Sequence, residues 1–458
     1  MAGTTVKPRG TLLLGSAGAM LVVAGGLAAY YAVATRTEAH AATVSRPATG
    51  DAPKIATGGK ALGALLAKPV ELKTGSATVS LAWSELGVEV DPDELGRGGA
   101  ADSDGDLAKL AKAGSVPLRV DRDKAVKTLL SLKAKYDKAP IDAYLDLEEK
   151  TIHADGPGQG IDVYASIGRI EAAARQAAPT IELASVAVPA SVTKQSIGID
   201  DISAVLGHYM TRFPVTDRDR NFNLKLAASK INGTVLKPHE EWSFNGHVGE
   251  RSEKEGYKIA HVITAGEMVD GLAGGTCQIS TTLFGAAFFA GLDIPKTTNH
   301  SRPSVYTPLG FDATVVWPDT DLVLKNPYEF PVTIHYRVAN GEALVEILGK
   351  KRPFDKIVFA RKILEETPYA TEERLDEEMP DGQTSLDQAG FNGYKLTRFR
   401  RFFEGKKMVR EQKWTVNYKP VTEYVRRGTS KDPDAKMPPT KEIHGPKVPT
   451  GDEFSMAQ

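Results

Sequence analysis

Between residues 70 and 200 the spacing of hydrophobic residues switches several times between a two-residue period and a helical one. A two-residue period puts alternate side chains on one face of a strand, whereas recurrence every three or four residues puts them on one face of a helix. Strand-like patterns occur at residues 79–83, 141–147 and 181–188, and helical patterns at residues 123–135 and 165–177. This alternation predicts a mixed domain of helices and strands over residues 70–200.

A second region with mixed patterns covers residues 204–350. A helical pattern at 223–231 stops at Asn232-Gly233, which suits a helix C-terminus, and a longer helix is predicted from Gly275 to Gly291. Strands are predicted at residues 234–236, 241–244, 313–317, 322–325, 332–338 and 343–348, the last four as consecutive antiparallel strands. Alternation places His335 opposite its apolar neighbours, so we expect it to face solvent.

The pattern over residues 354–429 is entirely strand-like. Residues 395–404 and 408–418, joined through Gly405, predict a long charged hairpin. Apolar residues are sparse here, which predicts an elongated module with exposed faces. The tail at 430–458 is rich in Pro, Lys and Asp and is expected to be disordered. The whole chain is therefore predicted to be a multidomain α+β protein.

The N-terminal part carries an export signal. Residues 10–35 contain no charged side chain and follow Lys7 and Arg9, and at about 1.5 Å per residue they are long enough to span a bilayer. The basic residues predict that residues 1–9 stay in the cytoplasm and that a linker at 36–69 leads to the extracytoplasmic bulk of the chain. A cleaved signal peptide is the alternative, with small-x-small sites at 32–34 and 39–41. Either interpretation exports the protein.

Composition limits the classes of function. The chain has 458 residues, 41% of them hydrophobic, and a net charge of −1, which gives no electrostatic basis for nucleic-acid binding. Its single cysteine cannot form an intramolecular disulfide. One cysteine and nine scattered histidines also lack the close ligand pairs of a structural zinc site, so we expect no metal and no cofactor.

That cysteine, Cys277, is placed where its thiol can react. It follows Gly274-Gly275 and is predicted to lie in the first turn of a helix. Unpaired backbone N–H groups and the helix dipole favour the thiolate at such a position. The amides near Cys277 and Gln278 are also candidates for an oxyanion-binding role. The alternative is that Cys277 is a small buried apolar residue.

A cysteine nucleophile needs a base, and that base is commonly oriented by a third group. His300 lies in a polar loop, and Asp312 follows it at the start of a predicted strand. We therefore expect Cys277, His300 and Asp312 to form a Cys-His-Asp arrangement. His300 as an ordinary loop histidine and Asp312 as a turn residue are the alternatives, and His261 is the reserve base.

Residues 221–349 resemble the VanW domain. The resemblance rests on motifs in matching order: Phe222 to Ala228, Trp242-Ser243-Phe244-Asn245, Val248-Gly249-Glu250-Arg251, Gly256-Tyr257, Gly274 to Leu283, His300-Ser301, and Tyr306 with Gly310 to Val315. The preceding region resembles a peptidoglycan-binding domain at residues 141–146 and 158–162. Residues 354–429 resemble the five-glycine module, through Gly382, Gly390, Gly393, Gly405 and Gly428.

The resemblance implies a cell-wall protein. The VanW family is associated with glycopeptide resistance, and some members are regarded as L,D-transpeptidases whose motif cysteine is the nucleophile. It implies that Cys277, His300 and Asp312 are catalytic. Substrate-binding or oxyanion roles are then expected for Gly275, Thr276, Gln278, Ser280, Ser301 and Tyr306. Many relatives have a third glycine where this chain has Thr276, which stiffens the entry to the helix.

Three functions stay open at this point. The first is a membrane-anchored L,D-transpeptidase that acts on peptidoglycan stem peptides through a Cys277 thioester. The second is a non-catalytic peptidoglycan-binding or scaffold protein linked to glycopeptide resistance or envelope maintenance. The third is a redox-sensitive thiol that pairs between chains. The expected partners are peptidoglycan and the cytoplasmic membrane.

Overall fold

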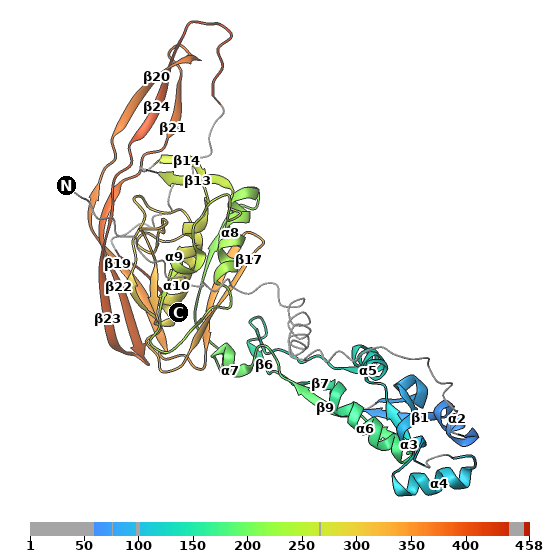
Figure 1. Ribbon diagram of the computed structural model, residues 1–458. Helices are drawn as coiled ribbons and strands as arrows, with labels where there is room; N and C mark the ends of the chain where they lie inside the picture. The colour runs from blue at the N-terminus through green and yellow to red at the C-terminus, as the bar shows by residue number, and fades with distance from the viewer. Residues whose placement is uncertain (1–58, 76, 98–100, 265–266, 439–452) are drawn as a thin grey trace, which may run out of the picture. The chain divides into compact units, whose positions relative to one another are not determined.

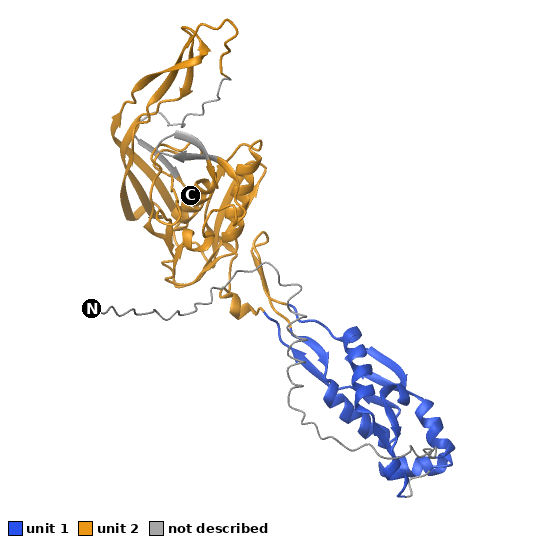
Figure 2. Cartoon of the chain, turned by 45° about the horizontal axis from the view of Figure 1, so that its top comes forward, with its two compact units in different colours: residues 1–141, 157–191 blue, residues 142–156, 192–458 orange. Residues whose placement is uncertain are grey.

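The computed structural model describes residues 59–438 and 453–458, except residues 76, 98–100 and 265–266. The expected membrane segment at 10–35 lies outside the described residues, as does most of the linker. Within the described ranges no helix is long and apolar enough to cross a bilayer. The chain divides into two compact units, one running to Ile141 and resuming at Pro157–Ser191, the other comprising Asp142–Gly156 and Val192–Gln458 (Figure 2).

The first unit is a small α+β domain built on the sheet β2-β1-β8. Its elements are α2 (Lys60–Ala67), β1 (Pro69–Thr74), β2 (Ala77–Ala82), η1 (Trp83–Leu86), β3 (Val88–Val90), α3 (Pro92–Leu95), α4 (Asp104–Ala113), β4 (Leu118–Val120), α5 (Arg122–Tyr136), β7 (Gly158–Ile161), α6 (Val163–Arg175), β8 (Thr180–Glu182) and β9 (Ser185–Val188). The predicted helix at 123–135 is confirmed, since Ala125, Leu129 and Leu132 of α5 are buried in the core.

The strand predicted at 181–188 is in fact two strands. β8 pairs with β1, whereas β9 pairs with β7. The chain changes sheets at Leu183 and Ala184, both buried, and the Ala184 N–H donates to Ser166 Oγ of α6 at 2.9 Å. The apolar run at residues 181–188 therefore indicates that the segment is buried, but it does not show that the segment forms a single strand.

The second unit begins with the region that contains the cysteine. Its elements are β5 (Tyr144–Asp146), β6 (Thr151–His153), α7 (Lys194–Ile197), β10 (Ala204–Arg212), α8 (Arg218–Ile231), β11 (Val235–Leu236), β12 (Glu241–Ser243), α9 (Phe244–Val248), β13 (Ile259–Thr264), β14 (Glu267–Leu272), α10 (Thr276–Ala290), β15 (Asp293–Lys296), β16 (Val323–Lys325), β17 (Val332–Ala339) and β18 (Glu342–Gly349). The main sheet has the order β10-β18-β17-β11.

Helix α10 is the centre of this unit. It begins after Gly275, whose φ is 105°, and ends at Gly291, whose φ is 81°, as predicted from the two glycines. Nearly every side chain along it is buried, because the sheet covers one side and the long strands β19 and β22 lie on the other (Figure 1). Gly207 of β10 allows the close approach, since a Cβ there would lie 2.2 Å from the Ala290 nitrogen.

One strand prediction in this region is wrong, and one predicted strand is present but has other partners than expected. Residues 313–317 form no strand, because their carbonyls bond side chains of α10: Ala313 O accepts from Ser280 Oγ at 2.6 Å and Thr281 Oγ1 at 3.1 Å. The next predicted strand, β16, joins β12 and β15 in a separate three-stranded sheet. Only β17 and β18 form the expected antiparallel pair.

His335 does not face solvent, contrary to the alternation rule. It is 5% exposed on β17 because the segment 142–156 covers that face of the sheet. Its Nδ1 lies 3.0 Å from Glu346 Oε2 and its Nε2 lies 3.4 Å from Glu148 Oε1. A polar residue on a strand can thus be buried when another segment supplies acceptors for it.

The C-terminal region is all β, as predicted. Its strands are β19 (Lys356–Thr367), β20 (Thr371–Pro380), β21 (Thr384–Gln388), β22 (Gly393–Glu404), β23 (Lys407–Tyr418), β24 (Glu423–Ser430) and β25 (Glu453–Ala457). β22 and β23 form the expected long hairpin inside the sheet β23-β22-β19-β25, and the sheet β20-β24-β21 extends away from α10 (Figure 1).

Only part of this region has the exposed faces that we expected. Phe359 of β19 and Phe402 of β22 belong to the same buried cluster as Phe288 of α10. Arg400, fully buried, donates from Nη1 to Leu292 O at 2.7 Å and from Nη2 to Ala287 O at 3.1 Å. The sheet therefore shares one core with the cysteine-containing region.

Candidate active site

Cys277 lies in the first turn of α10 with its side chain half-buried. Its sulfur is 3.3 Å from both Thr314 Oγ1 and Val315 O. The loop before the helix is fixed by Asn223 of α8, whose side-chain amide donates to Gly274 O at 3.1 Å. The thiol is thus held in one place at the start of a helix, where the helix dipole favours its ionised form.

His300 is positioned by Asp312. The His300 main-chain N–H donates to Asp312 Oδ2 at 2.7 Å, and the ring Nδ1 lies 2.6 Å from the same oxygen. The buried carboxylate keeps a proton on Nδ1. The second nitrogen, Nε2, is then available to interact with a group on the opposite side of the ring. The imidazole lies close enough to the Cys277 thiol for each group to shift the pKa of the other. The structure therefore brings Cys277, His300 and Asp312 together in that order.

Asp312 is held in turn by a residue that sequence reasoning missed. The carboxylate is 1% exposed, and its Oδ1 accepts a hydrogen bond from the hydroxyl of Tyr418, at the end of β23. That hydroxyl accepts from the Gly310 N–H at 2.9 Å. Tyr418 belongs to the hairpin that we described only as charged. Nothing near it in the sequence indicates a link with Asp312.

The three groups shift one another's ionisation. Burial raises the pKa of the Cys277 thiol, but the hydrogen bond and the charge of His300 outweigh this and lower it to about 7. Burial lowers the pKa of His300, yet Tyr306, Asp312 and the thiol together hold it well above its usual value. Burial also opposes ionisation of Asp312, but the hydrogen bond from His300 keeps its pKa below the usual range. These directions favour a thiolate beside an imidazolium.

The other predicted site residues divide into two groups. The side chains of Thr276, Gln278 and Ser280 are buried and bond inside the unit, to Ala273 O, Arg212 O and Ala313 O respectively. Gly275 provides the positive φ at the start of the helix.

Ser301 and Tyr306 are the more accessible members of the predicted set. Ser301 is exposed, and Tyr306 is half-buried with its ring edge-on to that of His300 at 6.4 Å. Contact with a substrate side chain is therefore open to these two residues.

Two backbone amides at the helix start were expected to bind an oxyanion, those of Cys277 and Gln278. The Gln278 N–H is used, since it donates to Gly275 O at 2.8 Å. In the described part of the chain the Cys277 N–H has no such backbone acceptor. Of the two amides that we expected near an oxyanion, Cys277 is the available one. The described residues also contain no group of three or more His, Cys, Asp or Glu side chains arranged to hold a metal ion.

Family models match three parts of the chain. Residues 104–182 match a "Putative peptidoglycan binding domain", residues 219–348 match a "VanW like protein", and residues 361–430 match a "G5 domain". The cysteine, the histidine and the aspartate all lie in the second match. Tyr418 lies in the third.

Two curated proteins are similar to part of the chain. "Uncharacterized protein YoaR" of Bacillus subtilis (strain 168) is 39% identical over 142 residues, which is 31% of this chain and 47% of that protein. "Vancomycin B-type resistance protein VanW" of Enterococcus faecalis (strain ATCC 700802 / V583) is 27% identical over 144 residues, 30% of this chain and 52% of that protein. The chain spans about half the length of the curated relatives it matches.

Among solved structures, an IgA1 protease G5 domain is 21% identical with a TM-score of 0.12, covering 16% of this chain and 92% of that one. The G5 domain of HP0197 is 19% identical with a TM-score of 0.10, covering 16% and 97%. The sequence matches are the informative ones, and together they follow the chain in order. The chain carries a VanW-family domain, preceded by a peptidoglycan-binding domain and followed by a G5 domain.

Proposed function

We propose that this chain is an exported, membrane-anchored cell-wall protein that performs L,D-transpeptidase-like acyl transfer on peptidoglycan stem peptides. One observation supports the chemistry most directly: a half-buried thiol faces an imidazole that a buried carboxylate holds in place. The same arrangement activates cysteine nucleophiles on unrelated folds. The flanking domains matched in the sequence support a substrate in the cell wall.

The proposed reaction has two halves. The Cys277 thiolate attacks the carbonyl carbon that precedes the terminal D-residue of a tetrapeptide stem, and the Cys277 N–H donates to the developing oxyanion. The C–N bond then breaks as the His300 imidazolium gives its proton to the leaving amine, which departs as a free amino acid and leaves the stem as a thioester. An amine of a second stem attacks the thioester, His300 takes its proton, and the thiolate leaves.

This exchange of one amide for another needs no external energy source, which suits a site outside the membrane. If water replaces the acceptor amine, the same site acts as a carboxypeptidase. The two outcomes differ only in the acceptor. A second stem must therefore reach the thioester faster than water does.

The direct test uses the full-length protein in detergent with tetrapeptide muropeptides, followed by mass spectrometry of the products. The wild type is expected to give cross-linked dimers and free D-amino acid, and Cys277→Ala is expected to give neither. A thioester adduct on the intact protein is the expected intermediate. Absence of dimer and of hydrolysis with the wild type, or equal product with Cys277→Ala, would rule out the proposed activity.

Membrane anchoring rests on residues 10–35, which are uncharged and follow two basic residues. Expression of the full chain and fractionation of the cells is the test. An uncleaved anchor predicts that the protein sediments with membranes and keeps its N-terminal residues in mass spectrometry. Release of a shortened chain into the soluble exported fraction would favour a cleaved signal instead.

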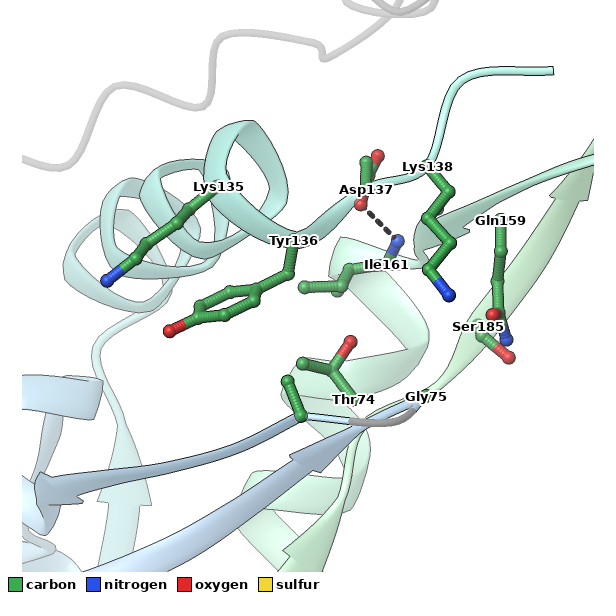
Figure 3. Close-up of a pocket in the computed structure, with 11 residues that line it drawn as sticks. Thr74, Gly75, Lys135, Tyr136, Asp137, Lys138, Gln159, Ile161 and Ser185 are labelled. Atoms are coloured by element: carbon green, nitrogen blue, oxygen red, sulfur yellow. Dashed lines mark hydrogen bonds between the residues drawn. The ribbon is translucent and has the colours of Figure 1, made fainter. Parts of the chain in front are cut away.

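A second candidate function is non-catalytic wall binding, and a cavity in the first unit favours it. The cavity measures about 280 Å³ and is lined by polar side chains that include Tyr136, Lys138, Gln159 and Ser185 (Figure 3). Of these four residues, Tyr136, Lys138 and Gln159 lie within the part matched by the peptidoglycan-binding model. Hydroxyl, amide and ammonium groups around one small cavity suit a polar peptide or sugar.

The two functions are separable by mutation. Lys138→Ala with Gln159→Ala is expected to weaken sedimentation of the protein with purified cell walls while leaving the reactivity of Cys277 unchanged, because all these cavity residues lie in the first unit. If the double variant sediments with cell walls as well as the wild type does, the cavity is not the wall-binding site. Wall binding by Cys277→Ala at the wild-type level, without any reaction on stems by the wild type, would make binding the main function.

A further inference from the structure

Two arginines lie near Cys277 without a carboxylate partner. Arg251 follows α9, and its Nη2 donates to Asn245 Oδ1 at 2.6 Å. Arg220 is in α8, and its Nη2 donates to Gln278 Oε1 at 2.7 Å, one residue after the cysteine. Among the described residues neither guanidinium forms an ion pair. Both hydrogen-bond partners are neutral side-chain amides, and the carboxylates that act on these charges, Asp217 on Arg220 and Asp321 on Arg251, do so without an ion pair.

Several donors of this group are unused. The buried atoms without a hydrogen-bond partner include Nη1 of Arg220, Nε and Nη1 of Arg251, and the hydroxyl of Tyr257. Tyr257 is only 2% exposed, and its oxygen and the Arg251 guanidinium interact electrostatically. Buried donors are almost always paired, so a cluster of unpaired ones indicates an acceptor that the protein itself does not supply.

The arginines are electrostatic neighbours of the thiol. Burial lowers the pKa of both Arg220 and Arg251, while the negative charge of a Cys277 thiolate is among the groups that raise it. Asp217 raises the pKa of Arg220 and Asp321 that of Arg251 as well, but neither carboxylate forms an ion pair with its guanidinium group. A second anion beside the sulfur would therefore gain more from this site than it loses in hydration.

The orientation of Arg251 is fixed before any ligand arrives. Asn245, which holds its Nη2, donates from Nδ2 to the carbonyls of Val316, Pro318 and Thr320 at 3.0 to 3.3 Å. These carbonyls belong to the same irregular segment whose Val315 O bonds the cysteine sulfur. Arg251, through Asn245, and Cys277 are thus both attached to one short stretch of chain, residues 315–320, which sets their relative position.

We propose that Arg251, with Arg220 and Tyr257, forms a carboxylate-binding subsite beside Cys277 that selects acyl donors whose departing residue has a free C-terminal carboxylate. A guanidinium presents two parallel N–H groups that match the two oxygens of a carboxylate, and a neutral amide offers no such pair. The consequence for the reaction rests on the proposed function. The anion site itself does not.

The site can be tested without a turnover assay by alkylating Cys277 in the full-length protein. Iodoacetate carries a carboxylate and iodoacetamide does not, so the ratio of their rate constants reports an anion site next to the sulfur and cancels changes in thiol ionisation. We expect Arg251→Gln to lower the iodoacetate-to-iodoacetamide ratio by about five- to tenfold. Arg251→Lys keeps the charge but loses the paired N–H groups, so its ratio is expected to lie between those of the wild type and Arg251→Gln.

A matched control is Arg337→Gln, which removes an exposed arginine of β17 that pairs with Glu148. It is expected to leave the ratio unchanged. Tyr257→Phe removes only an unpartnered hydroxyl, folds as the wild type does, and is expected to lower the ratio by a smaller factor than Arg251→Gln. Equal ratios in the wild type, Arg251→Gln and Tyr257→Phe would overturn the subsite.

The second test compares a tetrapeptide stem with its C-terminal carboxamide. The wild type is expected to use the carboxylate form with a KM at least tenfold lower, and Arg251→Gln is expected to remove that preference by raising KM more than it lowers kcat. Equal use of both forms by the wild type would overturn the selectivity. Reaction with neither form would contradict the proposed transpeptidase, while the alkylation ratio would still decide the anion site.

Discussion

The ionisation of Cys277 depends on one imidazole. With His300 in place the pKa of the thiol is lowered to about 7, so roughly half of it is thiolate at neutral pH. His300→Gln removes the imidazole and its positive charge from beside the thiol, and the thiol pKa is then expected to rise toward about 8.5. The thiolate fraction at pH 7 falls accordingly, and the rate of iodoacetamide alkylation there is expected to fall by about tenfold.

The measurement is the alkylation rate of the single cysteine across pH 5 to 10. The inflection is expected to move upward in His300→Gln, and to move upward less in Asp312→Asn, which keeps the imidazole but weakens its orientation. His335→Gln changes a histidine on another face of the sheet and serves as the control. An inflection near 8.5 in the wild type would contradict the pairing of thiol and imidazole.

The sequence predicted three members of this site and missed the fourth for a physical reason. Each of the three has a recognisable local sequence context. Cys277 follows a glycine pair at a helix start, His300 lies in a polar loop, and Asp312 lies at the start of a strand-like pattern. Tyr418 has none, because it lies 106 residues after Asp312 and its neighbours describe an ordinary charged hairpin. A hydrogen bond between distant segments leaves no pattern in a single sequence. The same holds for His335, whose burial depends on Glu148.

Tyr418 gives the second prediction at this scale. Tyr418→Phe keeps the ring but removes a donor to Asp312 and an acceptor for the Gly310 N–H, both buried. The loss is expected to destabilise the protein by about 1–3 kcal/mol. Because Asp312 then orients His300 less well, the thiol inflection is also expected to rise.

Tyr394→Phe is the control for that substitution, since its hydroxyl is on the same sheet beside Asn392 and Glu366. Thermal unfolding and the alkylation profile measure the two effects separately. A stable Tyr418→Phe protein with an unshifted thiol would mean that the hydroxyl does not help to position Asp312.

Helix α10 packs closely against its surroundings where a glycine leaves room for a neighbouring side chain. A Cβ at Gly285 would lie 2.4 Å from the ring of Tyr209 on β10, so Gly285→Ala must displace the ring or the helix. We expect a loss of about 1–3 kcal/mol in the free energy of unfolding. Gly63→Ala in α2 is the matched control, because nothing lies within 4 Å of its Cβ. There the better helix propensity of alanine is expected to stabilise by up to about 1 kcal/mol.

Thermal unfolding of both variants measures the comparison. Equal stability of Gly285→Ala and the wild type would show that the helix and β10 are not tightly packed.

The ends of α10 were predictable because Gly275 and Gly291 mark them. Residues 313–317 are not a strand because their carbonyls accept hydrogen bonds from the side chains of Ser280, Thr281 and Cys277 in this helix. The pattern of apolar residues does not indicate those donors.

At the scale of the whole molecule, motif boundaries and packing boundaries differ. The VanW model ends at residue 348 and the G5 model starts at 361, yet Phe359 and Phe402 are buried in one cluster with Phe288 of α10. Likewise residues 142–156 group with the second unit, although the sequence pattern placed them in the first domain. Composition and motifs show which domains are present. The shared core, however, depends on which faces of the helices and strands pack against each other, and the motifs do not show this.

The shared core leads to the last prediction, which concerns truncation. A chain that ends at residue 350 keeps every catalytic candidate but loses Tyr418, Arg400 and the phenylalanines of β19 and β22. Loss of each buried phenylalanine is expected to cost about 3–5 kcal/mol, which together approaches the whole stability of a typical domain. We therefore expect a chain that ends at residue 350 to lose the cooperative unfolding of its second unit and the depressed thiol pKa, whereas the chain that runs to residue 458 keeps both. Circular dichroism during heating and the alkylation profile of Cys277 are the measurements. A chain ending at residue 350 that keeps the unfolding transition of its second unit and alkylates with an inflection near pH 7 would show that the VanW-family domain forms its site without the C-terminal strands.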